Sequence, residues 1–169
     1  MAADRTTRMT PKRAGRAARE GSVFLSDAVA ANLRAERARR QVTQDEVAAR
    51  MRGLGHGSWT RATVSEVERA GRTITLDEFF GLALALGVSP GGLLSVHGAR
   101  VDLGGPANPV PAGFVALWLS GRFRAAVDPD HPESFVIEPA DGDPAGEPAG
   151  VADLRARFGD RVRYTGDAR

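Results

Sequence analysis

The stretch that decides the fold reads Thr43-Gln44-Asp45-Glu46-Val47-Ala48, and a second stretch, TRATVSEVER at residues 60 to 69, follows it. Thr43 is the expected N-cap of a helix, and Glu46 three positions later completes a capping box, in which each side chain accepts a hydrogen bond from the other residue's backbone amide. The pair fixes where a helix begins. In the second stretch, Val64 and Val67 lie at helical spacing and predict a short helix over residues 61 to 69 with one buried face.

Two short helices in this order indicate a helix-turn-helix, whose second helix lies in the major groove of DNA. With the two valines inward, the outward face of the second helix carries Arg61, Ala62, Thr63 and Glu66. Arginine can read guanine, glutamate can accept from cytosine, and alanine or threonine can meet a thymine methyl. The alternative is an ordinary solvated face with charges at helical spacing. Gln44 and the free amides beside it lie at a helix N-terminus, where a phosphate oxygen is favoured. Such a contact positions the protein on the DNA but does not read the base sequence.

Composition limits the classes of protein that the chain can belong to. Its 169 residues are 42% apolar and 6% aromatic, as in ordinary soluble domains. The absence of cysteine excludes disulfides, zinc-thiolate sites and thiol catalysis, and it fits a reducing cytoplasm. The apolar run from Phe79 to Val88 is too short to span a bilayer. We therefore expect a cytoplasmic protein without a membrane segment.

Charge is unevenly spread along the chain. Residues 1 to 25 carry six basic groups against two acidic ones, residues 26 to 98 nine against eight, and residues 99 to 169 eight against eleven. A basic leading segment and an acidic tail indicate that the front of the molecule meets a polyanion. Residues 1 to 24 lack apolar periodicity and are predicted to be a disordered basic arm.

Residues 25 to 98 are predicted to form a mainly α, five-helix bundle that folds alone. The expected helices cover about residues 27 to 40, 44 to 52, 61 to 69, 76 to 86 and 90 to 95. Ser26 or Asp27 is the expected cap of the first, and Thr75 with Glu78 forms a second capping box before the fourth. The residues expected to face the core are Val29, Leu33, Val47, Ala48, Met51, Val64, Val67, Leu76, Phe79, Leu82, Ala83, Leu86, Leu93 and Leu94.

Residues 28 to 95 resemble the xenobiotic-response-element (XRE) family of phage-repressor and Cro type regulators. The resemblance rests on several linked motifs: LRxxR at 33 to 37, VTQxxVA at 42 to 48, TVSxVE at 63 to 68, LxxF at 76 to 79, LAxALGVS at 82 to 89 and LL at 93 to 94. It implies a repressor-like bundle that binds a double-stranded DNA operator as a homodimer, with residues 61 to 69 as the recognition helix. It also implies that Arg37 and Glu68 form a charged pair between the first and third helices. The predicted DNA contacts are Gln44, Thr60, Arg61, Ala62, Thr63, Glu66, Arg69 and Arg72.

One segment departs from the family pattern. Residues 52 to 58, RGLGHGS, lengthen what is usually a tight turn, and their glycines indicate positive φ or mobility. We expect Trp59 to pack down as the anchor that ends this loop, and His56 either to be solvated or to touch a phosphate. A nucleotide-binding loop is disfavoured, because no strand precedes the glycines and no lysine follows them.

Residues 99 to 169 are predicted to be a short, irregular region of uncertain α+β content. Phe114 to Leu119 is a strand or a buried helical turn, Ser134 to Ile137 a strand, residues 151 to 158 a helix, and Arg161 to Thr165 a final strand. Trp118, Phe123 and Phe135 are enough for a small core or a dimer surface. The region can serve dimerisation, effector sensing or protein binding.

The leading interpretation is a sequence-specific DNA-binding transcriptional regulator of the repressor kind. The alternative is an antitoxin or anti-repressor, in which residues 99 to 169 bind a protein partner. We expect no enzymatic activity, no cofactor and no metal site. His131 lies near Asp128 and Asp130, but the stretch reads as a solvated turn with too few ligands for a metal.

Overall fold

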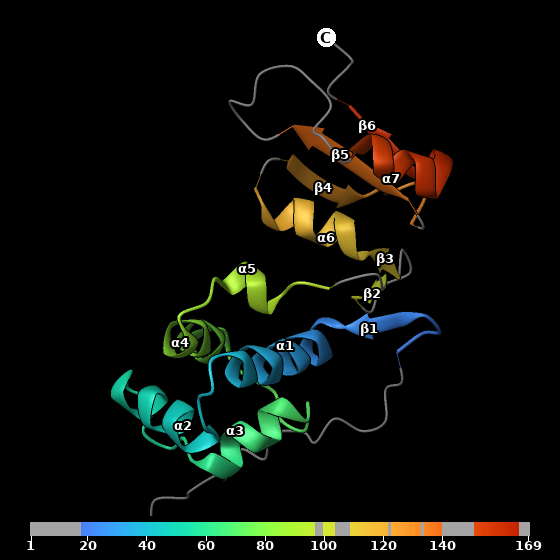
Figure 1. Ribbon diagram of the computed structural model, residues 1–169. Coiled ribbons are helices and arrows are strands. Elements are labelled where there is room, and N and C mark those ends of the chain that lie inside the picture. Colours follow the sequence, from blue (N-terminus) through green and yellow to red (C-terminus); the bar gives the residue numbers. More distant parts are fainter. Residues whose placement is uncertain are drawn as a thin grey trace, which may run out of the picture.

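The computed structural model of the chain describes residues 18–96, 100–103, 109–121, 123–132, 134–139 and 151–165. Most of the predicted basic arm, residues 1 to 17, lies outside the described residues. Figure 1 shows a helical part that contains α2 and α3 at one end of the molecule and a smaller α and β unit at the other end. The mainly α bundle with an irregular C-terminal region is confirmed.

The five predicted helices are all present: α1 (Leu25–Arg39), α2 (Gln44–Gly53), α3 (Arg61–Glu68), α4 (Leu76–Leu86) and α5 (Pro90–Leu93). The capping boxes of Thr43 with Glu46 and of Thr75 with Glu78 both form, so local chemistry sets the starts of α2 and α4. Gly87 ends α4 in the left-handed conformation at a φ of 66°.

The expected cap of α1 is wrong. Phe24, in an extended conformation and without a side-chain cap, precedes the first helical residue, so Ser26 and Asp27 already lie inside the helix. The reason is that a strand, β1 (Ser22–Phe24), runs directly into α1. Asp27 still lies in the first turn, where its charge is favourable to the helix dipole.

One core joins α1 through α5. All the expected inward residues of α1, α2 and α3 are buried, and Trp59, which is 1% exposed, fills the centre with them. Leu76 is the exception among the predicted core residues, because it is 70% exposed at the first position of α4. Phe79, one turn later, covers the core instead, while Leu94 is only partly buried against it.

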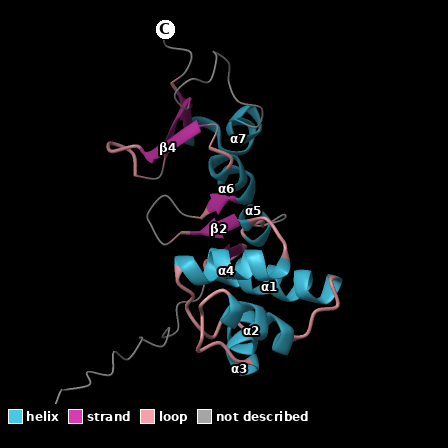
Figure 2. Ribbon diagram, turned by 90° about the vertical axis from the view of Figure 1, so that its left-hand side faces the viewer, coloured by secondary structure: helices cyan, strands magenta, loops and turns pink. Residues whose placement is uncertain are grey.

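A small sheet joins the segment before α1 to the residues that follow the helical bundle. β1 pairs in parallel with β2 (Arg100–Asp102), and β2 pairs antiparallel with β3 (Val110–Pro111). In both views this small sheet lies between the helical bundle and the C-terminal unit (Figures 1 and 2). Residues 22 to 24 therefore form a strand and differ from the predicted disordered arm.

The C-terminal unit has its own core. It contains α6 (Ala112–Leu119), β4 (Phe123–Val127), β5 (Phe135–Pro139), α7 (Val151–Phe158) and β6 (Val162–Tyr164), with β4 antiparallel and β6 parallel to β5. The segment from Phe114 to Leu119 is thus helical rather than a strand, whereas the strands at 134 to 137 and 161 to 165 and the helix at 151 are present within a residue or two. Phe114 packs on Phe135 with ring centroids 5.0 Å apart, but Trp118 is 43% exposed.

Candidate nucleic-acid interface

The start of α3 is built by two threonines. Thr60 is the N-cap and accepts a hydrogen bond from the Thr63 amide at 3.2 Å, while the Thr63 hydroxyl accepts one from the Thr60 amide at 3.2 Å. This third reciprocal cap was not predicted, because the usual capping box has glutamate or glutamine at the third position. Both side chains are therefore held against the backbone at the N-terminus of the helix.

The outward face of α3 is open to solvent. Arg61, Ala62 and Glu66 are exposed and Thr63 is partly exposed, whereas Val64 and Val67 are buried. Arg61 is 71% exposed, and its Nε lies 3.9 Å from a carboxylate oxygen of Asp45 on α2. Sequence reasoning missed Asp45, which has no signal in the local pattern, because the contact joins two helices. The Asp45 side chain is 74% exposed, so this ion pair lies in solvent and holds Arg61 only weakly.

Glu68, at the end of α3, connects three helices. Arg37 of α1 donates to its carboxylate through Nε at 2.6 Å and through Nη2 at 3.2 Å, so the predicted ion pair is present. Gln44, at the first position of α2, donates from Nε2 to the second carboxylate oxygen at 2.7 Å. The hydrogen bonds raise the pKa of Arg37, chiefly through the side-chain contact with Glu68. Gln44, predicted as a phosphate contact, thus lies at the α2 N-terminus beside α3.

Arg69 and Arg72 lie at the other end of α3 and differ in their surroundings. Arg69 is exposed at the C-cap. The Arg72 guanidinium donates to Glu78 at 2.5 Å and lies 5.3 Å from the centre of the Trp59 ring. Arg72 is therefore engaged with the bundle itself.

Glu78 holds the insertion in place. Its Oε1 accepts from the Trp59 indole at 3.0 Å and from Arg72, and its Oε2 accepts from the Thr75 amide at 2.9 Å. Burial raises the pKa of Glu78, but the hydrogen bonds from Thr75, Arg72 and Trp59 outweigh it, so the pKa lies below its ordinary value. From the sequence, Glu78 is predictable only as a cap, because its contact with Trp59 is nonlocal.

The insertion between α2 and α3 is packed on α4. Trp59 is buried, as predicted, and of the three glycines only Gly55 has a positive φ, at 95°. His56 lies against Gly81 of α4, where a Cβ added to the glycine would meet the imidazole Nε2 at 2.8 Å. His56 is thus only partly exposed and faces α4.

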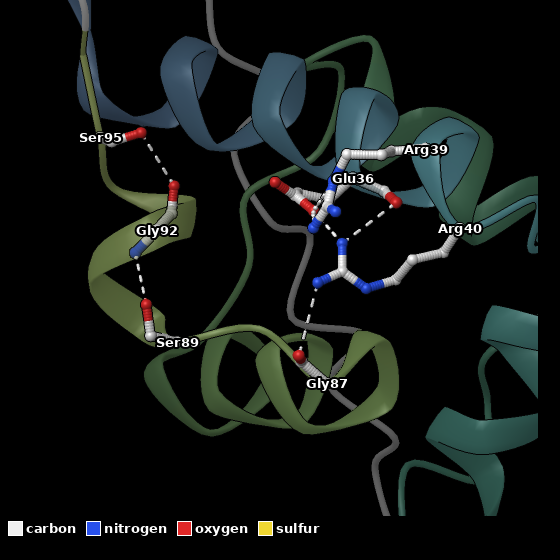
Figure 3. Close-up of polar contacts among 7 residues, drawn as sticks. All are labelled: Glu36, Arg39, Arg40, Gly87, Ser89, Gly92 and Ser95. Atoms are coloured by element: carbon white, nitrogen blue, oxygen red, sulfur yellow. Dashed lines mark hydrogen bonds and ion pairs between the residues drawn. The ribbon is translucent and has the colours of Figure 1, made fainter.

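The basic residues of α1 divide between bundle contacts and solvent. Figure 3 shows Arg39 and Arg40 gathered on Glu36, with Arg39 Nη2 2.8 Å from the carboxylate. Arg40 also pairs with Glu36 and reaches the carbonyl of Gly87 at 3.5 Å, so it ties the end of α1 to the end of α4. Arg37 is the member bound to Glu68, and Arg34 is exposed.

In the C-terminal unit, Asp128 is buried and accepts from Arg163 and from the amide of Asp130. Within the part of the chain that the structure describes, no group of three metal-ligating residues comes together. In the same part, no helix has the length and apolar character needed to cross a membrane.

The helical bundle is similar to known proteins. Residues 33–93 match the helix-turn-helix family model. The clp gene regulator ClgR from C. glutamicum is 29% identical over 43% of this chain and 87% of that chain, with a TM-score of 0.38. The restriction-modification controller protein C.AhdI from Aeromonas hydrophila is 26% identical over 40% of this chain and 94% of that chain, with a TM-score of 0.35. No curated protein matches the chain.

Residues 33–93, which run from α1 to α5, thus resemble the helix-turn-helix domain of XRE-type regulators. The match of residues 33–93 to that family model supports a DNA-binding transcription regulator.

Proposed function

We propose that the chain is a sequence-specific regulator that binds a double-stranded DNA operator and represses transcription by occupying it. The observation that carries this proposal is the exposed face of α3, with Arg61, Ala62 and Glu66 pointing away from the core beside the N-terminus of α2. Arginine and glutamate at such a face supply the donors and acceptors that the major groove matches. The amide groups at the start of α2 supply an anchor for a phosphate.

The remaining predicted contacts surround that face. Thr60 and Thr63 cap the N-terminal end of α3, which would enter the groove. Gln44 donates a hydrogen bond to Glu68 at the other end of α3, where Arg69 is exposed. Arg72 is held by Glu78, so the proposed interface relies on the other seven residues. The protein would act in the cytoplasm, where its operator lies, and we assign it no catalytic role.

A homodimer would give this short recognition helix enough base pairs to be specific, because two half-sites about one helical turn apart are then read together. The exposed apolar residues of α4 support such a dimer. Leu76, Phe80 and Leu84 recur every fourth position and are 70%, 47% and 71% exposed. An antiparallel pair of α4 helices would place Phe80 on the two-fold axis and each Leu76 opposite the second copy's Leu84, a self-complementary contact.

Footprinting on genomic fragments, followed by sedimentation of the free protein and its DNA complex, tests the proposal. We expect a protected site with dyad symmetry and a dimer on it. Phe80→Glu should abolish the dimer, whereas Leu54→Glu, a matched change at an exposed residue of the α2 C-cap, should leave it intact. No protection at low salt would disprove DNA binding, and protection by a monomer on an asymmetric site would disprove the dimer.

The second candidate function is an antitoxin or anti-repressor that binds another protein through residues 99 to 169. The adjacent Trp118 and Leu119, 43% and 50% exposed at the end of α6, favour it. Affinity purification of the wild-type chain and of Trp118→Ser from the source cell discriminates the two. A small partner retained only by the wild type would support this function, and purification of the chain alone would count against a protein partner.

A further inference from the structure

Arg52, in the last turn of α2, begins the insertion and reaches across to the start of α3. Its Nη1 donates a hydrogen bond to the carbonyl oxygen of Trp59 at 2.8 Å. Trp59 is 1% exposed and directly precedes Thr60, the N-cap of α3. A buried residue therefore holds the Arg52 guanidinium beside the end of α3 that the proposed function places in the major groove.

The rest of the Arg52 guanidinium is available to a ligand. The residue is exposed, and neither its Nε nor its Nη2 has an acceptor among the residues that the structure describes. Arg50, two positions earlier, differs, because its Nη1 donates to the carbonyl oxygen of Ala85 on α4 at 2.8 Å. Arg52 is thus a cation with one donor fixed and others free, and a guanidinium fork matches the oxygens of a phosphate.

The chain around Arg52 carries no opposing charge. Residues 47 to 65 contain three arginines and no acidic residue. Glu78, which contacts the Trp59 side chain from α4, already holds Arg72. The insertion also leaves its backbone uncovered, since an added Cβ would meet nothing within 4 Å at Gly53, Gly55 and Gly57. A basic surface of bare backbone lets a polyanion come close.

The length of α2 separates Arg52 from the phosphate anchor at the other end of that helix. Gln44 is the first residue of α2, and Arg52 lies eight residues later. At about 1.5 Å per residue the two positions are about 12 Å apart along the helix axis. The major groove of DNA is about 12 Å wide. The two ends of α2 can therefore face the two phosphate backbones that border the groove, with α3 between them.

We propose that the insertion supplies a second anchor on the DNA backbone, in which Arg52 binds a phosphate across the major groove from the phosphate at the start of α2. This anchor rests on the proposed DNA binding and adds a role for the lengthened turn. Because the contact is made to a phosphate, it strengthens binding to every duplex and fixes how α3 enters the groove, without reading bases.

The affinity of the full chain for a random-sequence duplex, measured over a series of salt concentrations, tests the anchor without an operator. Arg52→Gln should weaken binding several-fold at low salt and make the slope of log affinity against log salt shallower by about 1. Arg52→Lys keeps the charge and should keep most of the slope. Arg50→Gln is the matched control, because it removes the same charge two positions away and should leave the slope unchanged.

The outcomes separate the anchor from DNA binding itself. A wild-type slope in Arg52→Gln, or an equal change in Arg50→Gln, would overturn the anchor while DNA binding stands. A wild-type chain that binds no duplex at low salt would overturn both proposals. Phosphate ethylation interference on the protected site then locates the contact. One interfering phosphate in each half-site should be lost with Arg52→Gln, and an unchanged interference pattern would overturn the anchor.

Discussion

Arg37 of α1 and Glu68 of α3 are joined by two hydrogen bonds of 2.6 and 3.2 Å, with side chains only 19% and 5% exposed. Removing one partner leaves an uncompensated charge, so Arg37→Ala or Glu68→Ala should lower the free energy of unfolding by roughly 3 to 5 kcal/mol. The double variant should lose less than the sum of the two, as measured by urea unfolding in a mutant cycle.

The exposed pair of Asp45 and Arg61 is the internal control, because its removal should cost less than about 1 kcal/mol. Additive losses of that small size at Arg37 and Glu68 would show two independent surface charges.

Glu78 should make the bundle sensitive to acid. Its pKa is lower in the folded state than in the unfolded chain, so its charge contributes stability above an unfolded pKa of about 4.3. That contribution is lost as the pH falls through the lower folded pKa. Glu78→Gln should therefore destabilise the protein at pH 7 by about 1 to 3 kcal/mol, with the difference shrinking toward pH 3. Denaturant unfolding at several pH values measures this, and a constant difference, or one matched by Asp77→Asn, would refute it.

Because His56 lies against Gly81, the effect of Gly81→Ala on stability should change sign when the His56 ring is removed. Gly81→Ala places a methyl group 2.8 Å from the imidazole Nε2 and 3.1 Å from the Met51 methyl, so we expect a net loss of stability of about 1 to 2 kcal/mol. In a His56→Ala background the steric conflict with the ring is gone. The same substitution should then be neutral or stabilising by up to about 1 kcal/mol, because alanine is the better helix former. Equal losses in both backgrounds would mean that His56 does not set the cost.

Arg61 and Glu66 should read bases, whereas Gln44 should position the backbone of the DNA. Ala at either of the first two should reduce affinity for the preferred operator by about 1 to 3 kcal/mol and relax preference at particular base pairs. Gln44→Ala should weaken binding to all duplexes alike. Affinities of each variant for the operator and for a random duplex, measured side by side, distinguish base reading from backbone contact. Equal losses on both duplexes for all three variants would exclude α3 as the reading element.

The basic segment that precedes β1 should add affinity without specificity. A chain that begins at Ser22 loses six basic groups but keeps the strand that pairs with β2. It should fold normally, retain operator preference, and show a shallower slope of log affinity against log salt, since each phosphate contact releases counterions. An unchanged slope would show that the segment does not touch DNA.

Local chemistry made the helices predictable. The capping boxes at Thr43 and Thr75 act within one turn, and the valines of α3 follow its period, so boundaries and buried faces followed from short windows. The exposure of Leu76 and the strand at residues 22 to 24 could not be predicted from short windows. Both depend on which distant segments of the chain pack against these residues.

The same distinction holds at the proposed interface. The Arg37 and Glu68 pair followed from the family resemblance, but the contacts of Asp45 with Arg61 and of Glu78 with Trp59 join residues whose nearness no periodicity encodes. They arise only when α2, α3 and α4 are packed together.

The parallel pairing of Phe24 with Asp102 brings the entrance and the exit of the helical bundle to neighbouring positions. The helix-turn-helix domain is thereby organised like an insert in a host domain, with both of its ends on one small sheet. A domain whose two ends are adjacent can be inserted into a surface loop of another protein without distorting that protein, whereas a domain with distant ends would distort it. Its natural cut points are the two paired strands, not the first residue of α1.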